Sequence, residues 1–244
     1  MLAVLLLSLR VTPVFALAPP FTLTRTPTLF RVVFGMGLSA TLVSAYPATR
    51  EVADLVLSGL VAAAARELVL GAMVVLTFQM MFAALYVAGR TLDIQAGFGL
   101  SLLIDPTTQT QAPLAGTLFA YAAGAVFFAM DGHIELLRLL GASLEAIPLG
   151  SAATLPSLGR MAAFISAVFA TAMGVAGGAI LCLFLADLAI ALLSRTTPQL
   201  NVLVLGFQVK TLLLFLVLPG AFGMAGALFV RLSRITLEAL PGLL

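Results

Sequence analysis

Long apolar runs alternate with short polar breaks along the whole chain. Stretches without a charged residue cover residues 32–49, 68–89, 106–130, 161–186 and 211–230. A helix needs about 20 residues to cross the hydrocarbon core of a bilayer. Together with the apolar N-terminus, the pattern predicts six helices at about 2–18, 28–46, 66–90, 113–140, 159–194 and 203–235. We therefore expect an all-α, membrane-associated protein of about six long hydrophobic helices.

Prolines mark the expected connections between these helices. Pro19 and Pro20 follow the first segment, Pro106 and Pro113 bracket a polar stretch, and Pro148 precedes a stretch rich in Gly, Ser and Ala. A helix does not easily continue through such positions. Pro219 and Gly220 lie inside the last apolar run, where we expect a kink or a hairpin bend after which the helix resumes.

Composition supports the membrane assignment independently of the pattern. Apolar residues make up 62% of the chain and charged residues 9%, whereas soluble domains carry about 25% charged residues. The mean hydropathy is +1.19. The net charge of +2 is too small to predict nucleic-acid binding. The sequence also shows no basic stripe with interleaved aromatic residues.

The first apolar segment has a second interpretation as a secretory signal, because the sequence F-A-L-A at residues 15–18 resembles a cleavage site. A signal peptide begins with a positive region, however, and the only early charge is Arg10 within the apolar run. We therefore favour a retained helix.

Few residues are suited to covalent chemistry. His133 is the only histidine and Cys182 the only cysteine, so a structural zinc site with four such ligands cannot form from this chain alone. The G-x-S-x-G nucleophile motif is not found. We expect no enzymatic activity, no catalytic residue, no cofactor and no metal.

Small residues recur at one-turn spacing in three of the predicted helices. The stripes are Gly35 with Ser39, Gly116 with Gly124, and a third stripe around Gly174. Such stripes let helix backbones approach closely. A single pair reflects the general frequency of Gly in membrane helices, but three stripes in one chain favour helix assembly.

A polar cluster separates the last two apolar runs. It consists of Asp187, Arg195, Gln199, Asn201 and Lys210. Charges cost roughly 2.5 to 3.5 kcal/mol each in hydrocarbon, so these side chains must face protein or water. An ordinary loop at the headgroups and a proton or ion relay are two interpretations. We favour structural ion pairing near a helical hairpin, because a relay needs a longer series of ionisable groups.

Three strings between residues 93 and 210 carry a family resemblance. Residues 186–210 read A-D-L-A-I-A-L-L-S-R-T-T-P-Q-L-N-V-L-V-L-G-F-Q-V-K, and residues 93–106 read D-I-Q-A-G-F-G-L-S-L-L-I-D-P. D-G-H at residues 131–133 is followed by I-P-L-G at 147–150. These strings, in their order along the chain, resemble signatures of the FliR/SctT family of type III export gate proteins.

The resemblance implies a fold, partners and a location. It implies one FliR-type domain over residues 1–244 built of kinked hairpins, with residues 1–150 FliP-like and residues 151–244 a FliQ-like helical hairpin. The implied partners are FliP, FliQ, FlhB-type gate proteins, inner membrane lipid and unfolded flagellar export substrates. The implied location is the bacterial inner membrane, multi-pass, at the flagellar basal body. Much of such a gate is lifted out of the lipid plane, so hydropathy overstates the number of true membrane spans.

The segment from Gly97 to Ile104, called here the seal segment, is the candidate for a role in the export pore. Gly97, Gly99 and Ser101 give backbone freedom, and apolar constrictions gate pores by excluding water. The candidate seal residues are Phe98, Leu100, Leu102, Leu103 and Ile104. The alternative is a buried connector between two helices.

Two other functions remain open on the sequence. The first is the equivalent gate subunit of a virulence type III secretion system, although Gly206 with Phe207 and the D-G-H string lean toward the flagellar form. The second is a secondary transporter of small solutes, which would show internal repeats with polar midplane sites. We find no matching pair of such sites.

Overall fold

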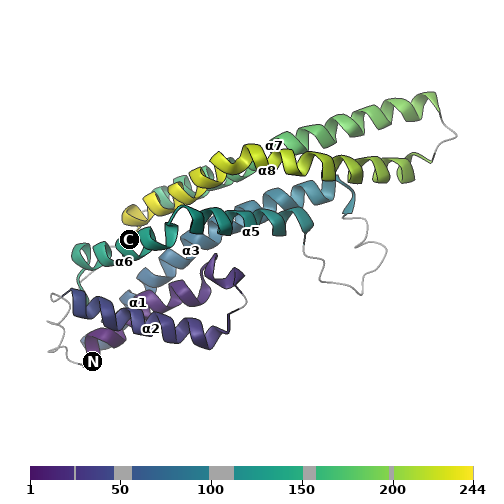
Figure 1. The fold of residues 1–244 in the computed structure, drawn as a ribbon. Helices are drawn as coiled ribbons and strands as arrows, with labels where there is room; N and C mark the ends of the chain where they lie inside the picture. Colours follow the sequence, from purple (N-terminus) through teal and green to yellow (C-terminus); the bar gives the residue numbers. More distant parts are fainter. Residues whose placement is uncertain (25, 47–56, 99–112, 151–157, 198–200, 244) are drawn as a thin grey trace. The chain divides into compact units, whose positions relative to one another are not determined.

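The computed structural model describes residues 1–24, 26–46, 57–98, 113–150, 158–197 and 201–243. Every element in these ranges is a helix (Figure 1). The elements are α1 (Leu2–Leu17), a short 3-10 helix η1 (Phe21–Leu23), α2 (Thr28–Ala45), α3 (Leu57–Gln95), α5 (Leu114–Ala129), α6 (Gly132–Ala146), α7 (Leu158–Thr196) and α8 (Val202–Leu243). The all-α prediction is confirmed.

The predicted helix at residues 113–140 is in fact two helices. α5 ends at Ala129 and α6 begins at Gly132. Between them Asp131 adopts a left-handed conformation with φ 57° and ψ 26°, which a continuing right-handed helix cannot accommodate. One helix was predicted because residues up to Met130 carry no charge. The Asp131-Gly132 dipeptide is typical of a turn and indicates the break.

The last apolar run contains no hairpin. α8 continues as one helix from Val202 to Leu243 and passes through Pro219. Proline removes one backbone hydrogen bond from a helix, and this loss does not end α8.

Three of the described helices are long and apolar enough, by length and composition, to cross a membrane. They comprise residues Thr28–Ala45, Gly59–Gln95 and Gly159–Thr196, and a fourth span results if α5 and α6 count as one broken span. Length and apolar character thus identify an integral membrane protein, with fewer candidate spans than the six predicted apolar segments.

The chain forms two compact units. Unit 1 contains residues Met1–Met81, Phe127–Ala167 and Ser233–Leu244, and unit 2 contains Phe82–Val126 and Val168–Leu232. Unit 1 has a closed apolar core that draws on α1, α3 and α6, with members including Leu7, Val11, Phe78, Leu136 and Leu140. All five side chains are 2% exposed or less.

A buried ion pair crosses the core of unit 1. Arg10 of α1 donates from Nε and Nη2 to the carboxylate of Glu67 in α3, at 2.6 and 3.1 Å. The same guanidinium donates to the carbonyl oxygens of Ser143 and Ile147 at the end of α6, each at 3.1 Å. Arg10 is 1% exposed and Glu67 is 2% exposed. The pair therefore joins three helices with both charges shielded from solvent.

α2 packs on α1 through one of the predicted small-residue stripes. Gly35 and Ser39 are the buried residues of α2, and a Cβ added at Gly35 would lie 2.8 Å from the Cα of Thr12. The predicted close approach is present there. The opposite side of α2 is apolar and exposed, as at Leu29 and Phe30.

In unit 2, α7 and α8 form an antiparallel pair (Figure 1). Gly206 faces Ile190 near one end of this pair, and Gly174 faces Leu228 farther along it. α3 and α5 also approach closely, because a Cβ at Gly89 would overlap the backbone of Gly116. Unit 2 is thus organised by helix contacts at glycine.

Candidate functional site

The polar cluster of the last hairpin is centred on an ion pair in unit 2. Lys210 of α8 lies 2.9 Å, from Nζ to Oδ1, from Asp187 of α7. The Lys210 side chain is 19% exposed and that of Asp187 is 44% exposed. The antiparallel packing of α7 on α8 brings the two residues together although they are far apart in sequence. The lysine is the more covered partner, so the carboxylate is the outward charge of the pair.

The other members of the cluster lie at the tip of the hairpin or outside the described residues. Asn201 accepts a hydrogen bond at Oδ1 from the backbone N–H of Val204, at 3.4 Å, and so satisfies a free N–H of the first turn of α8. Arg195 is exposed in the last turn of α7. Gln199 lies outside the described residues. Among the described members of the predicted cluster, only Asp187 and Lys210 are in direct contact.

The beginning of the seal segment contacts the start of α8. The rings of Phe98 and Phe207 lie edge to face, with centroids 6.3 Å apart. Gly97 has a φ of +95°, and a Cβ there would lie 3.0 Å from Cδ2 of Phe207. The positive φ favours glycine at this position, and a Cβ there would require the Phe207 ring to shift slightly. Two strings that carried the family resemblance therefore meet at Phe207.

Most of the predicted seal residues lie outside the described part of the chain. Leu100, Leu102, Leu103 and Ile104 fall in residues 99–112, and Phe98 alone is described. Their assignment to a seal stays a prediction.

A buried carboxylate connects the two helices that flank residues 99–112. Asp93 of α3 is 5% exposed, and its Oδ1 and Oδ2 accept the backbone N–H of Ala115, at 3.2 and 3.1 Å. Ala115 is in the first turn of α5, where backbone N–H groups lack helical partners. Asp93 thereby caps α5 and ties its start to the end of α3.

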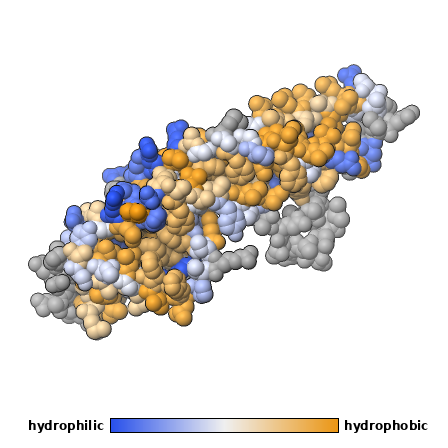
Figure 2. Space-filling view, in the orientation of Figure 1, coloured by the Kyte–Doolittle hydropathy of each residue, from blue (hydrophilic) through white to orange (hydrophobic). Residues whose placement is uncertain are grey.

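Apolar side chains surround the ion pair on the exposed side of the hairpin. Leu181, Phe184, Leu185, Leu188 and Leu192 of α7 are each more than half exposed, as are Leu212, Phe215 and Leu216 of α8. Figure 2 shows the apolar colouring over this pair of helices. An apolar surface of this extent marks a site of contact with protein or lipid.

Sequence reasoning did not assign roles to Asp93 or to the Arg10–Glu67 pair. The need for a partner could be predicted for each of these residues, because an ionisable residue inside an apolar helix must be paired. The partner of Arg10 is 57 positions away, and the partner of Asp93 is a backbone group. Neither kind of partner leaves a local pattern.

The arrangement offers polar anchoring of helices. Among the described residues, no three His, Cys, Asp or Glu side chains are grouped so that they could hold a metal ion. The contacts found here position helices and expose a carboxylate within an apolar surface.

Comparison with known proteins shows which family the chain resembles. Residues 1–235 match the family model described as bacterial export proteins, family 1. The chain is 30% identical to the flagellar biosynthetic protein FliR of Bacillus subtilis, over 99% of this chain and 94% of that protein.

Two further relatives align over shorter ranges. FliR of Escherichia coli is 27% identical over 59% of this chain and 56% of its own length. The secretion system apparatus protein SsaT of Salmonella typhimurium is 31% identical over 58% of this chain and 55% of its own length. The relatives thus include both flagellar and secretion-system proteins.

Proposed function

Because this chain belongs to the family of bacterial export proteins, family 1, we propose that it is a structural subunit of the flagellar type III export gate. The observation that carries the proposal is the similarity to FliR of Bacillus subtilis over 99% of the chain. The family consists of export proteins and is not an enzyme family, so the subunit contributes shape and contacts. The energy for export comes from elsewhere in the apparatus.

In this function the chain assembles with FliP, FliQ and FlhB-type proteins in the bacterial inner membrane, at the flagellar basal body. The exposed leucines of α7 and α8 support such assembly, because partner helices would remove them from water. The Asp187 carboxylate would give the contact a preferred register, since a carboxylate that becomes buried needs further hydrogen-bond donors beyond its one contact with Lys210. The assembled gate passes unfolded flagellar subunits through a central pore.

The seal segment would line the narrowest part of that pore. The contact of Phe98 with Phe207 supports this role, since it fixes the beginning of the segment against α8. The hydrogen bond from the Ala115 N–H to Asp93 also supports this role, because it joins the two helices that flank residues 99–112. The seal must widen around an unfolded chain and close again to exclude ions.

Copurification from the native host tests the assembly. The full chain is expressed with an affinity tag, solubilised in mild detergent and analysed by native mass spectrometry. Recovery with FliP-like and FliQ-like chains, together with rescue of motility in a strain lacking the gene, is the expected result. A stable lone monomer or homodimer would contradict the proposal and favour a transporter of small solutes.

The seal is tested separately. Replacement of Leu100 and Leu103 with Gly should increase ion conductance through the assembled gate. Unchanged conductance in a mutant complex that still assembles would contradict the seal and leave the assembly proposal intact.

The gate subunit of a virulence secretion system is the second candidate function. The 31% identity to SsaT of Salmonella typhimurium favours it. Recovery of the tagged chain with injectisome components, without rescue of motility, would establish this alternative.

A further inference from the structure

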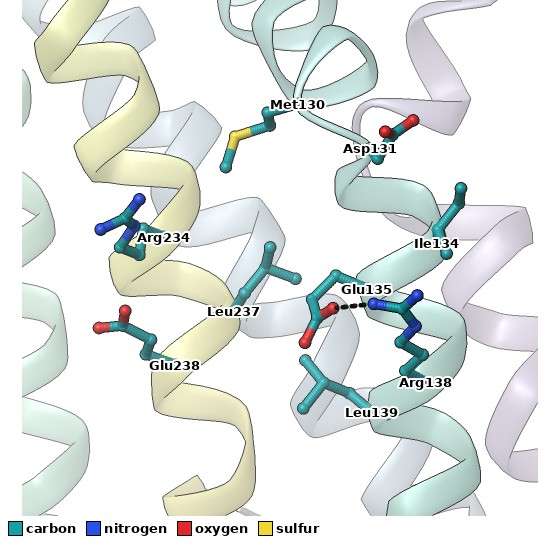
Figure 3. Close-up of a pocket in the computed structure, with 9 residues that line it drawn as sticks. All are labelled: Met130, Asp131, Ile134, Glu135, Arg138, Leu139, Arg234, Leu237 and Glu238. Atoms are coloured by element: carbon teal, nitrogen blue, oxygen red, sulfur yellow. Dashed lines mark hydrogen bonds and ion pairs between the residues drawn. The ribbon is translucent and has the colours of Figure 1, made fainter.

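A charged cavity of about 620 Å³ lies in unit 1 between α6 and the last turns of α8 (Figure 3). Asp131, Glu135 and Arg138 line it from the α6 side, and Arg234 and Glu238 line it from α8. The remaining lining residues are apolar and include Leu237, which points from α8 toward α6. The cavity therefore combines charges of both signs with an apolar surface.

The charges of the cavity are only partly paired. Arg138 donates from Nη1 to Oε2 of Glu135 at 3.4 Å. Asp131, Arg234 and Glu238 are exposed, and none of the three has an ion pair with another described residue. After internal pairing, one guanidinium and two carboxylates remain to meet a ligand.

Both walls of the cavity lie where the sequence changes from uncharged to charged. Residues 106–130 carry no charge, and Asp131 is the first charged residue after them. Residues 211–230 of α8 carry none, and Arg231, Arg234 and Glu238 follow. Such transitions occur at the level of the lipid headgroups in membrane proteins, because charges are costly within hydrocarbon, and this supports a headgroup-binding role for the cavity.

We propose that this cavity binds a zwitterionic phospholipid whose headgroup carries a phosphate and a primary ammonium, as in phosphatidylethanolamine. Arg234 would bind the phosphate, since a guanidinium matches phosphate oxygens with two parallel hydrogen bonds. Glu238, which lies one helical turn along α8 from Arg234 (Figure 3), would accept hydrogen bonds from the ammonium group. Leu237 and the other apolar lining residues would contact an acyl chain.

The sign of the lining selects this class over an anionic lipid. The lining holds three carboxylates and two guanidiniums, so a headgroup with only negative charge would meet net repulsion. A primary ammonium is also preferred over a trimethylated one, because carboxylates need N–H donors to form charge-assisted hydrogen bonds. The inference goes beyond the proposed function and requires only that the protein lies in a membrane.

Lipid retention measured by native mass spectrometry tests the proposal. The full chain, purified with the subunits that accompany it, is mixed with dioleoyl phosphatidylethanolamine, dioleoyl phosphatidylcholine or dioleoyl phosphatidylglycerol. The ethanolamine lipid should be retained about tenfold better than either of the others, the difference that one charge-assisted hydrogen bond produces. Equal retention of all three lipids, or preference for the glycerol lipid, would overturn the proposal.

Matched variants connect the retention to the cavity. Arg234→Gln and Glu238→Gln should each reduce retention of the ethanolamine lipid about tenfold. Arg231→Gln on α8 and Glu145→Gln on α6 are controls, since both residues are exposed and outside the cavity. Arg234→Lys keeps the cation and should restore part of the binding. A loss of the same size in the controls would contradict a specific site. Because the readout is lipid retention, failure here leaves the export proposal untouched.

Discussion

Two ion pairs join helices among the described residues, and they differ in almost every respect. The Arg10–Glu67 pair in unit 1 is 1% and 2% exposed, and backbone carbonyls satisfy the rest of the guanidinium. The Asp187–Lys210 pair in unit 2 is a single contact, with the carboxylate 44% exposed among exposed leucines. The first pair is complete within the chain, whereas the second presents a charge outward.

This difference indicates which interactions each unit completes by itself. A buried pair leaves no unsatisfied charge and serves the fold of unit 1. An exposed carboxylate on an apolar surface is costly once that surface is covered, unless the covering group supplies a donor. The core of unit 1 is therefore complete within the chain, whereas the exposed surface of α7 and α8 fits the covering partners proposed above. The following substitutions test that contrast, beginning with the largest expected effect.

Breaking the buried pair should have the largest effect. Glu67→Gln leaves the Arg10 guanidinium buried without a counter-charge, which costs about 3 to 5 kcal/mol of unfolding free energy. The measurement is thermal or denaturant unfolding of the full chain in mild detergent. The double variant Arg10→Met with Glu67→Leu should lose much less than the sum of the single changes, because apolar replacements remove both charges. Additive losses would contradict this account.

Adding a methyl group at the contact between α3 and α5 should have the second-largest effect on the free energy of unfolding. Gly89→Ala places a Cβ against the backbone of Gly116 and should cost about 1 to 3 kcal/mol by overpacking. Gly177→Ala is the matched control in the same unit, because a Cβ there meets nothing within 4 Å. The control should be neutral or stabilising by up to about 1 kcal/mol, since Ala favours helix more than Gly. Equal effects in the two variants would mean that backbone proximity is unimportant.

The cap of α5 should contribute a smaller amount. Asp93→Ala removes the acceptor of the Ala115 N–H group and should cost about 0.5 to 2 kcal/mol. Asp93→Asn retains an acceptor oxygen and should lose less than the alanine variant. Hydrogen exchange at the first turn of α5 is the sharper measurement, because loss of the cap should speed exchange there before the rest of unit 2. Unchanged exchange would contradict the capping role.

The exposed pair should have the smallest effect on the chain itself. Lys210→Met should change the unfolding free energy of the isolated chain by at most about 1 kcal/mol, since partly exposed pairs contribute little. Recovery of the assembled complex should fall much more strongly, because Asp187 then enters the interface without its partner. A large loss of chain stability with normal assembly would reverse the assignment of the two pairs.

Much of the fold follows from the uncharged runs. They place α1 and α2 to within a residue, since Leu2–Leu17 and Thr28–Ala45 match the predicted 2–18 and 28–46. α3 begins at Leu57, before the predicted start at residue 66. The prediction started too late because Arg66 and Glu67 resemble the end of an apolar segment. The helix continues through Glu67 because the ion pair with Arg10 neutralises the buried carboxylate. Arg10 and Glu67 are far apart in sequence, so this contact could not be predicted from the local pattern.

The candidate site was predictable in composition but not in geometry. An Asp and a Lys in adjacent apolar helices suggest a pair, and the hairpin brings Asp187 to Lys210. Arg195 and Asn201 belong to the same string, yet they lie at the tip, because helical rise separates residues that are only a few positions apart. The meeting of Phe98 with Phe207 joins two distant strings, and this proximity depends on the packing of α8.

The lengths of the long helices set a limit on how the protein sits in a bilayer. α3 and α7 contain 39 residues each and α8 contains 42, which at about 1.5 Å per residue is roughly 60 Å along each axis. The hydrocarbon core is about 30 Å thick. A helix of this length would need a tilt of about 60° to remain inside it, beyond the usual range of 0 to 40°. About half of a helix of this length would therefore lie outside the hydrocarbon if the helix crossed the bilayer, and its apolar side chains there would need to be covered by protein.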